Sequence, residues 1–435
     1  MLLYVLALLT FLIFTVLFYR KPKVETYVLF VIYALPFLDL KIIPVYLGYL
    51  RVFDAITLVG FIFLFKEFIF FSRPLKYSGY FILGLLFFIL SVISGLNAEF
   101  GFSNYFFYYP IITVFIFLRF LFISFENNFD HWKIINAFKT AYIFALFFMT
   151  LQFMFGLKFT LTPDIGVNVF NEDTGVTRYQ GIFGDSQLNG QFLAMGSFMF
   201  LLFQQNISLQ KKYLNYCGFT LGVVYLILAG SRSAVGGFLV GLLLLFLLSN
   251  LRVKVYGLVL GFIAIASLFL FAPDNAIFSR SGNLSNDLDF RQSIWEETII
   301  IIENHPFLGV GLGNFQEFTS KYNQDLYLEI APGEFLFFTQ PENGYLKILA
   351  EHGIIAFALF SLFFIIPFLN VTKGIFFSSV NKKTYFLIAA LCSWLVAFNT
   401  VYTLTDYRIL LLIALILFFT IVVFSKEDRI LNETL

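Results

Sequence analysis

Long apolar segments recur along the chain, separated by short segments that hold most of its charged residues. The hydrocarbon core of a bilayer is about 30 Å thick, so a helix that crosses it needs roughly 20 apolar residues. Because unpaired backbone groups are not tolerated in lipid, such runs predict helices. This pattern predicts an all-α, polytopic membrane helix bundle of about 12 to 13 transmembrane helices, centred near residues 10, 31, 59, 85, 113, 144, 196, 222, 241, 262, 357, 393 and 416.

The N-terminal part of this pattern is the least regular. Pro36, Asp39, Pro44 and Arg51 crowd the segment between the expected spans near residues 31 and 59. The first apolar run, Leu2 to Tyr19, lacks the basic segment that opens a signal peptide and a small-residue cleavage site. We therefore expect this run to be retained as the first span.

Basic residues are concentrated in alternate connecting segments, which hold 17 of the 28. Short loops rich in Lys and Arg remain cytoplasmic, and seven consecutive same-side segments hold 17 such residues: Arg20, Lys21 and Lys23; Lys66, Arg73 and Lys76; Arg119 and Lys133; Lys211 and Lys212; Arg252 and Lys254; Lys373, Lys382 and Lys383; Lys426 and Arg429. The opposite segments, 97–104, 158–185 and 273–343, are acidic or neutral and are expected to face the periplasm or exterior. The N-terminus then lies outside and the C-terminus inside.

The segment 273–344 is expected to form one long extracytoplasmic loop inserted between two transmembrane helices. Loops of this length are usually functional or disordered, and this one is too aromatic for disorder. Helical spacing predicts a short amphipathic helix in it, with an apolar face made of Phe290, Ile294, Trp295, Ile299 and Ile302. We find no internal repeat, so residues 1–435 are interpreted as a single membrane domain.

Composition excludes whole classes of protein. Residues of the AVILMFWYC set make up 60% of the chain and charged residues 13%, with a mean hydropathy of +0.86, which excludes a soluble domain. The chain holds 28 Lys and Arg against 27 Asp and Glu, so it lacks the basic excess of a nucleic-acid-binding protein.

Three arginines lie at outer ends of expected helices, where a charge needs a partner or a task. Arg178 precedes the span near residue 196, Arg232 lies in a minimal connection between two apolar runs, and Arg291 opens the loop helix. If they converge, their planar, permanently charged forks suit phosphate oxygens. Structural alternatives remain open for each: an ion pair of Arg178 with Glu172 or Asp173, interfacial snorkelling of Arg232, and an ion pair of Arg291 with Asp287 or Asp289.

Glu342 lies in Pro341-Glu342-Asn343-Gly344-Tyr345, at the outer mouth of the span near residue 357. It is a candidate general base if the site raises its pKa. The alternative is a solvated carboxylate that ends the loop.

Other motifs favour no chemistry. No strand precedes Gly309-x-Gly311-x-Gly313, so this motif does not indicate a nucleotide loop. The three histidines, His131, His305 and His352, lack the spacing of a metal site. Ser186 and Ser231 lack a His and Asp pair, which disfavours a serine hydrolase.

Four blocks of the sequence resemble the O-antigen ligase and Wzy polymerase superfamily of bacterial envelope polysaccharide assembly, which are membrane glycosyltransferases of the GT-C type. The blocks cover roughly residues 178 to 358, about two fifths of the chain, and their order, spacing and shared outer side make the resemblance specific. They are Arg178 to Asn189 with its core Gly-Ile-Phe-Gly-Asp-Ser-Gln-Leu-Asn; Ser231-Arg232-Ser233 followed by Gly236 and Gly241; Arg291 to Trp295 followed by His305-Pro306-Phe307-Leu308-Gly309-Val310-Gly311; and Glu342-Asn343-Gly344-Tyr345-Leu346 with Ala350-Glu351-His352-Gly353-Ile354.

The resemblance implies a site on the outer face of the bacterial cytoplasmic membrane that transfers a glycan from an undecaprenyl-pyrophosphate carrier to a sugar hydroxyl. It implies that the pyrophosphate is held by Arg178, Arg232 and Arg291, and that catalysis involves Glu342, Arg291 and Arg232. Glycan contacts are expected from Asn189, Trp295, Asn343 and Tyr345. Because the cations come from the protein, no metal or other cofactor is required.

One residue departs from the family pattern. Ligases of the family typically carry a histidine where this chain has Glu342. His352 is expected about three turns down the helix, too deep to take that role.

Four functions are weighed. The leading hypothesis is a Wzy-type polymerase that joins carrier-linked oligosaccharide repeat units, with the bilayer and a chain-length regulator as further partners and no nucleic acid. The alternatives are an O-antigen ligase that transfers glycan to a lipid or protein acceptor, and a transporter or flippase of lipid-linked glycan. A scaffolding protein would leave the three arginines unexplained.

Overall fold

The computed structural model of the chain describes residues 2–45, 48–70, 78–102, 104–161, 170–171, 176–204, 207–249, 284–322, 327–331, 334–338, 340–376 and 382–424. Its helices are α1 (Leu2–Arg20), α2 (Val24–Tyr33), η1 (Leu35–Phe37), α3 (Val52–Phe63), α4 (Phe65–Phe70), α5 (Ser78–Asn97), η2 (Tyr105–Phe107), α6 (Tyr108–Glu126), α7 (His131–Phe155), α8 (Ser186–Met199), α9 (Leu209–Leu228), α10 (Arg232–Leu248), α13 (Leu284–Asn304), α14 (Phe315–Tyr322), α15 (Gly344–Phe376), α16 (Lys382–Phe398), α17 (Tyr407–Phe418) and the π-helical turn η4 (Phe419–Val423). Short antiparallel hairpins pair β1 (Lys41–Val45) with β2 (Gly48–Arg51), β3 (Phe170–Asn171) with β4 (Val176–Thr177), and β5 (Tyr327–Ala331) with β6 (Glu334–Phe337).

The predicted all-α, polytopic architecture is confirmed, although the length of the helices varies more than the sequence suggested. Within the described ranges, 5 helices are long and apolar enough to cross a membrane: Leu2–Arg20, Gly79–Asn97, Tyr105–Glu126, His131–Phe155 and Gly344–Thr372. The spans expected near residues 31, 59, 196, 241, 393 and 416 are helices of only 10 to 17 residues. The span expected near residue 262 lies outside the described residues. The span expected near residue 222 is α9, which has 20 residues but is not among these five. Length and apolarity together therefore do not reach the predicted 12 to 13 spans in the described part of the chain.

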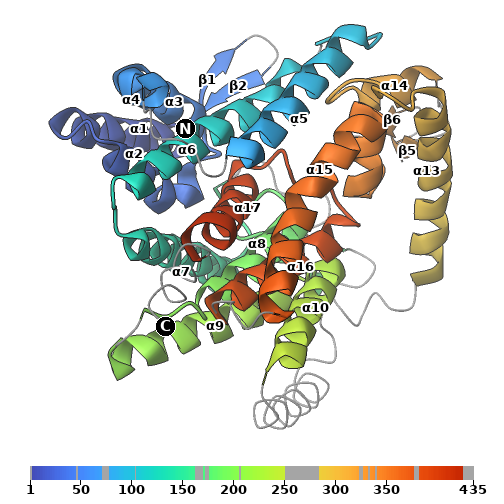
Figure 1. The fold of residues 1–435 in the computed structure, drawn as a ribbon. Coiled ribbons are helices and arrows are strands. Elements are labelled where there is room, and N and C mark those ends of the chain that lie inside the picture. Colours follow the sequence, from blue (N-terminus) through green and yellow to red (C-terminus); the bar gives the residue numbers. More distant parts are fainter. Residues whose placement is uncertain are drawn as a thin grey trace.

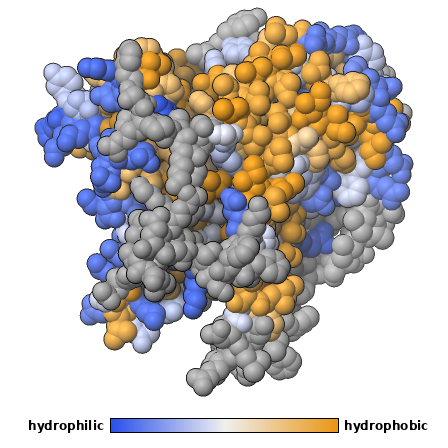
Figure 2. Space-filling view, viewed as in Figure 1, coloured by the Kyte–Doolittle hydropathy of each residue, from blue (hydrophilic) through white to orange (hydrophobic). Residues whose placement is uncertain are grey.

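Helix α17 lies at the centre of the assembly (Figure 1), and every residue of it except Leu410 is buried. A helix that is buried on nearly all sides and apolar after its first turn is typical of the interior of a membrane bundle. On the outside, Figure 2 shows hydrophobic side chains gathered over the part of the surface that α5 and α15 form in Figure 1. Such a surface suits contact with lipid chains.

Helices α10 and α16 pack closely because small residues line their interface. A Cβ atom added at Gly237 would lie 2.1 Å from the carbonyl oxygen of Ser393, and one added at Gly241 would lie 2.6 Å from that of Ala389. Small residues that let two backbones approach are a common device for helix pairing in membranes. The packing fixes α10 and thereby Arg232 at its first turn.

We expect Gly237→Leu to destabilise the protein by about 1 to 3 kcal/mol, since a larger side chain must push the α16 backbone away. Gly236 is the matched control, because a Cβ atom added there meets nothing within 4 Å. Gly236→Ala should keep or raise stability, as Ala favours a helix by about 1 kcal/mol over Gly. Thermal unfolding in detergent measures both variants, and equal losses in the two would contradict the packing argument.

The long loop is tied to α15 where that helix is interrupted. Gly353 has φ 76° and ψ 176°, and a Cβ atom there would lie 2.2 Å from the carbonyl oxygen of Phe307. Backbone hydrogen bonds join the two segments: Val310 N to Ala350 O at 2.8 Å, Gly311 N to Glu351 O at 2.9 Å, and Ile354 N to Pro306 O at 2.8 Å. The third and fourth sequence blocks are thus paired through their backbones, which fixes the exit of α13.

Helix α13 stands at the edge of the assembly beside α14 (Figure 1) and matches the amphipathic helix predicted in the loop. Its predicted apolar face is partly wrong. Ile294, Thr298 and Ile301 are buried, whereas Ile299 is 44% exposed. The buried residues are spaced i, i+4 and i+7 from Ile294, as on one face of a helix. Ile299 and the neighbouring Ile300 lie on the exposed face. The hairpin β5–β6 in the same loop was not predicted.

Candidate active site

The site begins at the sharp entry to α15. Glu342 adopts a φ of 49°, a left-handed conformation that costs energy for a residue with a side chain. The next residue, Asn343, caps the helix, since its Oδ1 accepts hydrogen bonds from the backbone N–H groups of Tyr345 at 3.0 Å and Leu346 at 3.2 Å. Asn343 Nδ2 also donates to Asn399 Oδ1 at 3.0 Å. These bonds hold the strained turn and so fix the direction of the Glu342 carboxylate.

Helix α13 contributes two contacts to the same turn. Arg291 Nη2 lies 3.5 Å from Glu342 Oε2, and both side chains are about a quarter exposed, at 28% and 24%. One turn further, Trp295 Nε1 donates to the Pro341 carbonyl at 3.0 Å. The structure thus pairs Arg291 with Glu342, a partner that the sequence did not indicate, and the side chains of the expected partners Asp287 and Asp289 lie outside its described part.

The Glu342 carboxylate has two charged neighbours with opposite effects. Burial raises the pKa of Glu342 above its usual range, Arg291 lowers it by favouring the ionised form, and Asp185 raises it by like-charge repulsion. Hydrogen bonds place α8 near this turn, because Gln191 Nε2 of α8 donates to Ala397 O at 3.2 Å, two residues from the Asn399 that Asn343 contacts. The site therefore joins the N-terminal ends of α8 and α15 with the first half of α13.

The block from Arg178 to Asn189 is a loop that ends in α8. Asp185 caps this helix by accepting from the backbone N–H groups of Gln187 and Leu188. Gly181, with φ 60°, exchanges hydrogen bonds with the amide of Gln152 at 2.8 Å. Arg178 is buried, only 5% exposed, at the beginning of this loop. Its suggested partners Glu172 and Asp173 lie outside the described residues.

The segments that carry Arg178 and Arg232 are neighbours. Tyr179 N donates to Leu228 O at 3.4 Å, at the end of α9 and just before the turn with Arg232. On the other side of this turn, a Cβ atom added at Gly190 of α8 would lie 2.7 Å from Ser231 Cβ. Arg232 is half-buried in the first turn of α10. The structure thus brings the segment of Arg178 beside that of Arg232, and Arg291 beside Glu342.

The polar atoms of the residues predicted to contact glycan are engaged within the protein. Asn189 is buried, and its Nδ2 donates to Tyr179 O at 2.9 Å. Tyr345 donates its hydroxyl to Leu395 O at 2.6 Å, and Asn343 and Trp295 make the bonds described above. These contacts show a bracing role for the four residues, and contact with glycan stays a prediction. His352 is buried too, with Nδ1 2.9 Å from Ser91 Oγ.

A second set of charges was missed by the sequence analysis. Arg408, on α17, is paired with Asp406 and lies 3.6 Å from Asp39. Its Nη1 donates to Ile182 O at 2.6 Å, and its guanidinium lies 4.1 Å from the centre of the Phe183 ring. Arg408 therefore supports the loop between Arg178 and Asp185 through its contacts with Ile182 and Phe183.

The same network extends to the N-terminal part of the chain. Arg51 pairs with Asp39 and donates to Thr405 O at 3.4 Å, while Tyr407 donates its hydroxyl to Asp54 at 2.5 Å. The signal was present in the sequence, because Asp39 and Arg51 lie between the expected spans near residues 31 and 59, and Asp406 and Arg408 lie at the start of the span near residue 416. Only the fold shows that they meet.

The arrangement suits an anionic group that approaches from the side of the helix starts. Helices α8, α10 and α15 begin here, and the N-terminal end of a helix favours negative charge. Arginine side chains at the same place add charge-assisted hydrogen bonds. A carboxylate with a raised pKa next to them is able to accept a proton from a hydroxyl group.

Comparison with known families gives a match at residues 217–361, to the family described as O-Antigen ligase. The matched segment contains Arg232, Arg291 and Glu342, and confirms the resemblance to the ligase and polymerase superfamily. Arg178 and Asn189 lie before it. No curated protein matches the chain.

Proposed function

We propose that the protein is a polymerase of Wzy type, because residues 217–361 match the O-antigen ligase family and Glu342 stands where ligases of that family typically carry a histidine. It joins undecaprenyl-pyrophosphate-linked oligosaccharide repeat units on the outer face of a bacterial cytoplasmic membrane. The donor and acceptor are both carrier-linked glycans. A chain-length regulator is proposed as a further partner.

The observation that supports this proposal most directly is the pairing of Arg291 with Glu342 at 3.5 Å. A glycosyl transfer from a pyrophosphate needs a cation at the leaving group and a base at the incoming hydroxyl. The two side chains supply both from one place, and both lie where α8, α10 and α15 begin.

The proposed reaction is a single displacement at the anomeric carbon of the donor. The bond from this carbon to the pyrophosphate oxygen breaks, and its electron pair moves to that oxygen, where Arg291, Arg232 and Arg178 stabilise the developing charge. The acceptor hydroxyl attacks from the opposite face and inverts the centre. Its proton passes to Glu342, and the carrier pyrophosphate leaves.

Purified protein with a defined lipid-linked repeat unit tests the proposal. We expect a ladder of polymer lengths that persists with a chelator. Arg232→Ala and Arg291→Ala should each lower the rate by about a hundredfold or more, as expected for loss of a preorganised charge-stabilising group, and the Lys variants should recover part of it. Full activity of both Ala variants would contradict the assigned roles.

A ligase is the second candidate, favoured by the description of the matched family. It predicts one transfer to a lipid or protein acceptor and no ladder in the same assay. A flippase is separated by Arg291→Ala in cells: an enzyme loses polymer and keeps externalised monomer, whereas a flippase loses externalisation itself.

A further inference from the structure

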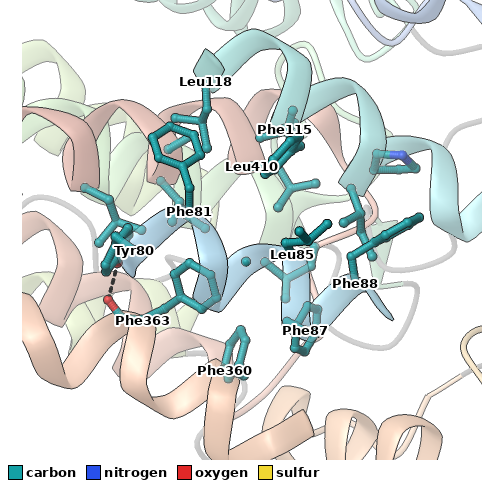
Figure 3. A pocket seen from close by; sticks show the side chains of 18 of the residues that line it. Tyr80, Phe81, Leu85, Phe87, Phe88, Phe115, Leu118, Phe360, Phe363 and Leu410 are labelled. Atoms are coloured by element: carbon teal, nitrogen blue, oxygen red, sulfur yellow. Dashed lines mark hydrogen bonds between the residues drawn. The ribbon is translucent and has the colours of Figure 1, made fainter. Parts of the chain in front are cut away.

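An apolar cavity of about 420 Å³ lies between α5, α6, α15 and α17. Figure 3 shows side chains of Phe81, Leu85 and Phe88 on α5 together with Phe115 of α6 and Phe360 of α15 around this space. Its described lining contains no charged side chain. At one end the Tyr80 hydroxyl donates to the Phe363 carbonyl, so even this polar group is satisfied by the protein.

Water and an empty space are both poor occupants of such a cavity. A buried water needs two to four polar partners, and this lining offers only the hydroxyl groups of Tyr80, Tyr402 and Thr405, the first of which already donates to Phe363 O. An empty cavity forfeits the dispersion contacts of the atoms around it. The wall includes Leu85 and Ile112, which are 46% and 39% exposed, so the space is reached from the lipid side. The suitable occupant is an apolar chain.

The cavity is elongated along α6. Its lining on and before this helix extends from Phe107 to Phe122, which is about 22 Å at 1.5 Å per residue. This shape suits an extended apolar chain.

The end of the cavity at Phe107 and Tyr402 adjoins the candidate active site. Lys347 Nζ lies 5.6 Å from the centre of the Phe107 ring and 5.0 Å from that of Tyr402, both of which line the cavity. The backbone N–H of Tyr402 donates to Gln340 Oε1 at 3.0 Å. Gln340 is two residues before Glu342, so a chain in the cavity would end close to the paired Arg291 and Glu342.

We propose that this cavity binds the long polyisoprenoid chain of the lipid-linked donor and thereby sets its pyrophosphate at the arginines. The inference rests on the proposed function. In this proposal the chain is bound by α5, α6, α15 and α17, and the glycan is acted on by a different set of residues.

Two neighbouring leucines on α5 provide a matched test. Leu85 lines the cavity and is 46% exposed, whereas Leu86 is 44% exposed and lies outside its lining. Leu85→Trp should raise KM for a donor with a full-length polyprenyl chain about tenfold, equivalent to 1.4 kcal/mol, with kcat nearly unchanged. A donor with a short farnesyl chain should be unaffected by it, and Leu86→Trp should change neither donor. Equal effects of the two substitutions, or equal effects on the two donors, would overturn the assignment.

A binding measurement separates this inference from the proposed function. A polyprenyl pyrophosphate with a diazirine at the far end of its chain should label α5, α6 or α17 in the wild-type protein, and Leu85→Trp should reduce the labelling. Labelling of the same residues by a diazirine phospholipid, undiminished by excess polyprenyl pyrophosphate, would show that bilayer lipid fills the cavity and would sink the inference. If no donor gives product while the polyprenyl probe labels the cavity, the proposed function fails and the chain site stands.

Discussion

Glu342→Gln is expected to lower kcat for glycan transfer between about a hundredfold and ten-thousandfold, the usual contribution of a general base. The amide keeps the size of the side chain but does not accept the hydroxyl proton. The turn that holds it should persist, because Asn343 caps α15 through its own side chain. Initial rates with a lipid-linked repeat measure the effect, and unchanged thermal unfolding serves as the control. A variant with near wild-type kcat would exclude Glu342 as the base.

The pH dependence of the wild-type protein gives this prediction a sign. Only ionised Glu342 accepts a proton, so activity should rise with pH through its pKa, which burial raises above the usual range of a carboxyl. Asp185 raises that pKa further and Arg291 lowers it. Asp185→Asn should therefore move the acid limb of kcat/KM to lower pH, while Asn still caps α8. Arg291→Met should move the limb of its residual activity to higher pH, and shifts in the reverse directions would refute the assignment.

Hydrophobic patterning predicted the long helices, whose sequences are apolar over the full thickness of a bilayer. The helices α1, α5, α6, α7 and α15 have long apolar runs, and their positions follow from the thickness of a bilayer. The same patterning predicted a full span near residue 196, where the structure has the shorter helix α8 of 14 residues. Its residues are buried by protein on all sides, and an apolar run buried by protein resembles one buried by lipid.

The candidate site was only partly predictable for a different reason. Charged residues at expected helix ends identified Arg291 and Glu342, because an unexplained charge near a membrane is a local feature of the sequence. Contacts between distant segments have no such local sign: Arg51 meets the carbonyl of Thr405, 354 residues further along the chain. The bracing roles of Asn189 and Asn343 likewise depend on the backbone around them, which residue type and spacing do not reveal.

Arg408→Met is expected to destabilise the protein by about 3 to 5 kcal/mol, the cost of removing one partner from a buried ion pair. Arg408 is 2% exposed and Asp406 6%, so the substitution leaves a buried carboxylate without its cation. It also removes the hydrogen bond to Ile182 O and the contact with Phe183, which together support the loop that leads to Asp185. Denaturant unfolding in detergent micelles measures the loss.

Lys321→Met is the matched control for Arg408→Met, because its salt bridge with Glu99 is exposed and should add little to stability. The double variant Arg408→Met with Asp406→Asn should regain part of the stability, since it removes both charges and Asn can still cap α17. Activity should recover less than stability does, because the double variant still lacks the guanidinium that holds Ile182 and Phe183. Full recovery of activity together with stability would show that Arg408 has no part in positioning the loop. The buried charge network would then contribute to stability alone.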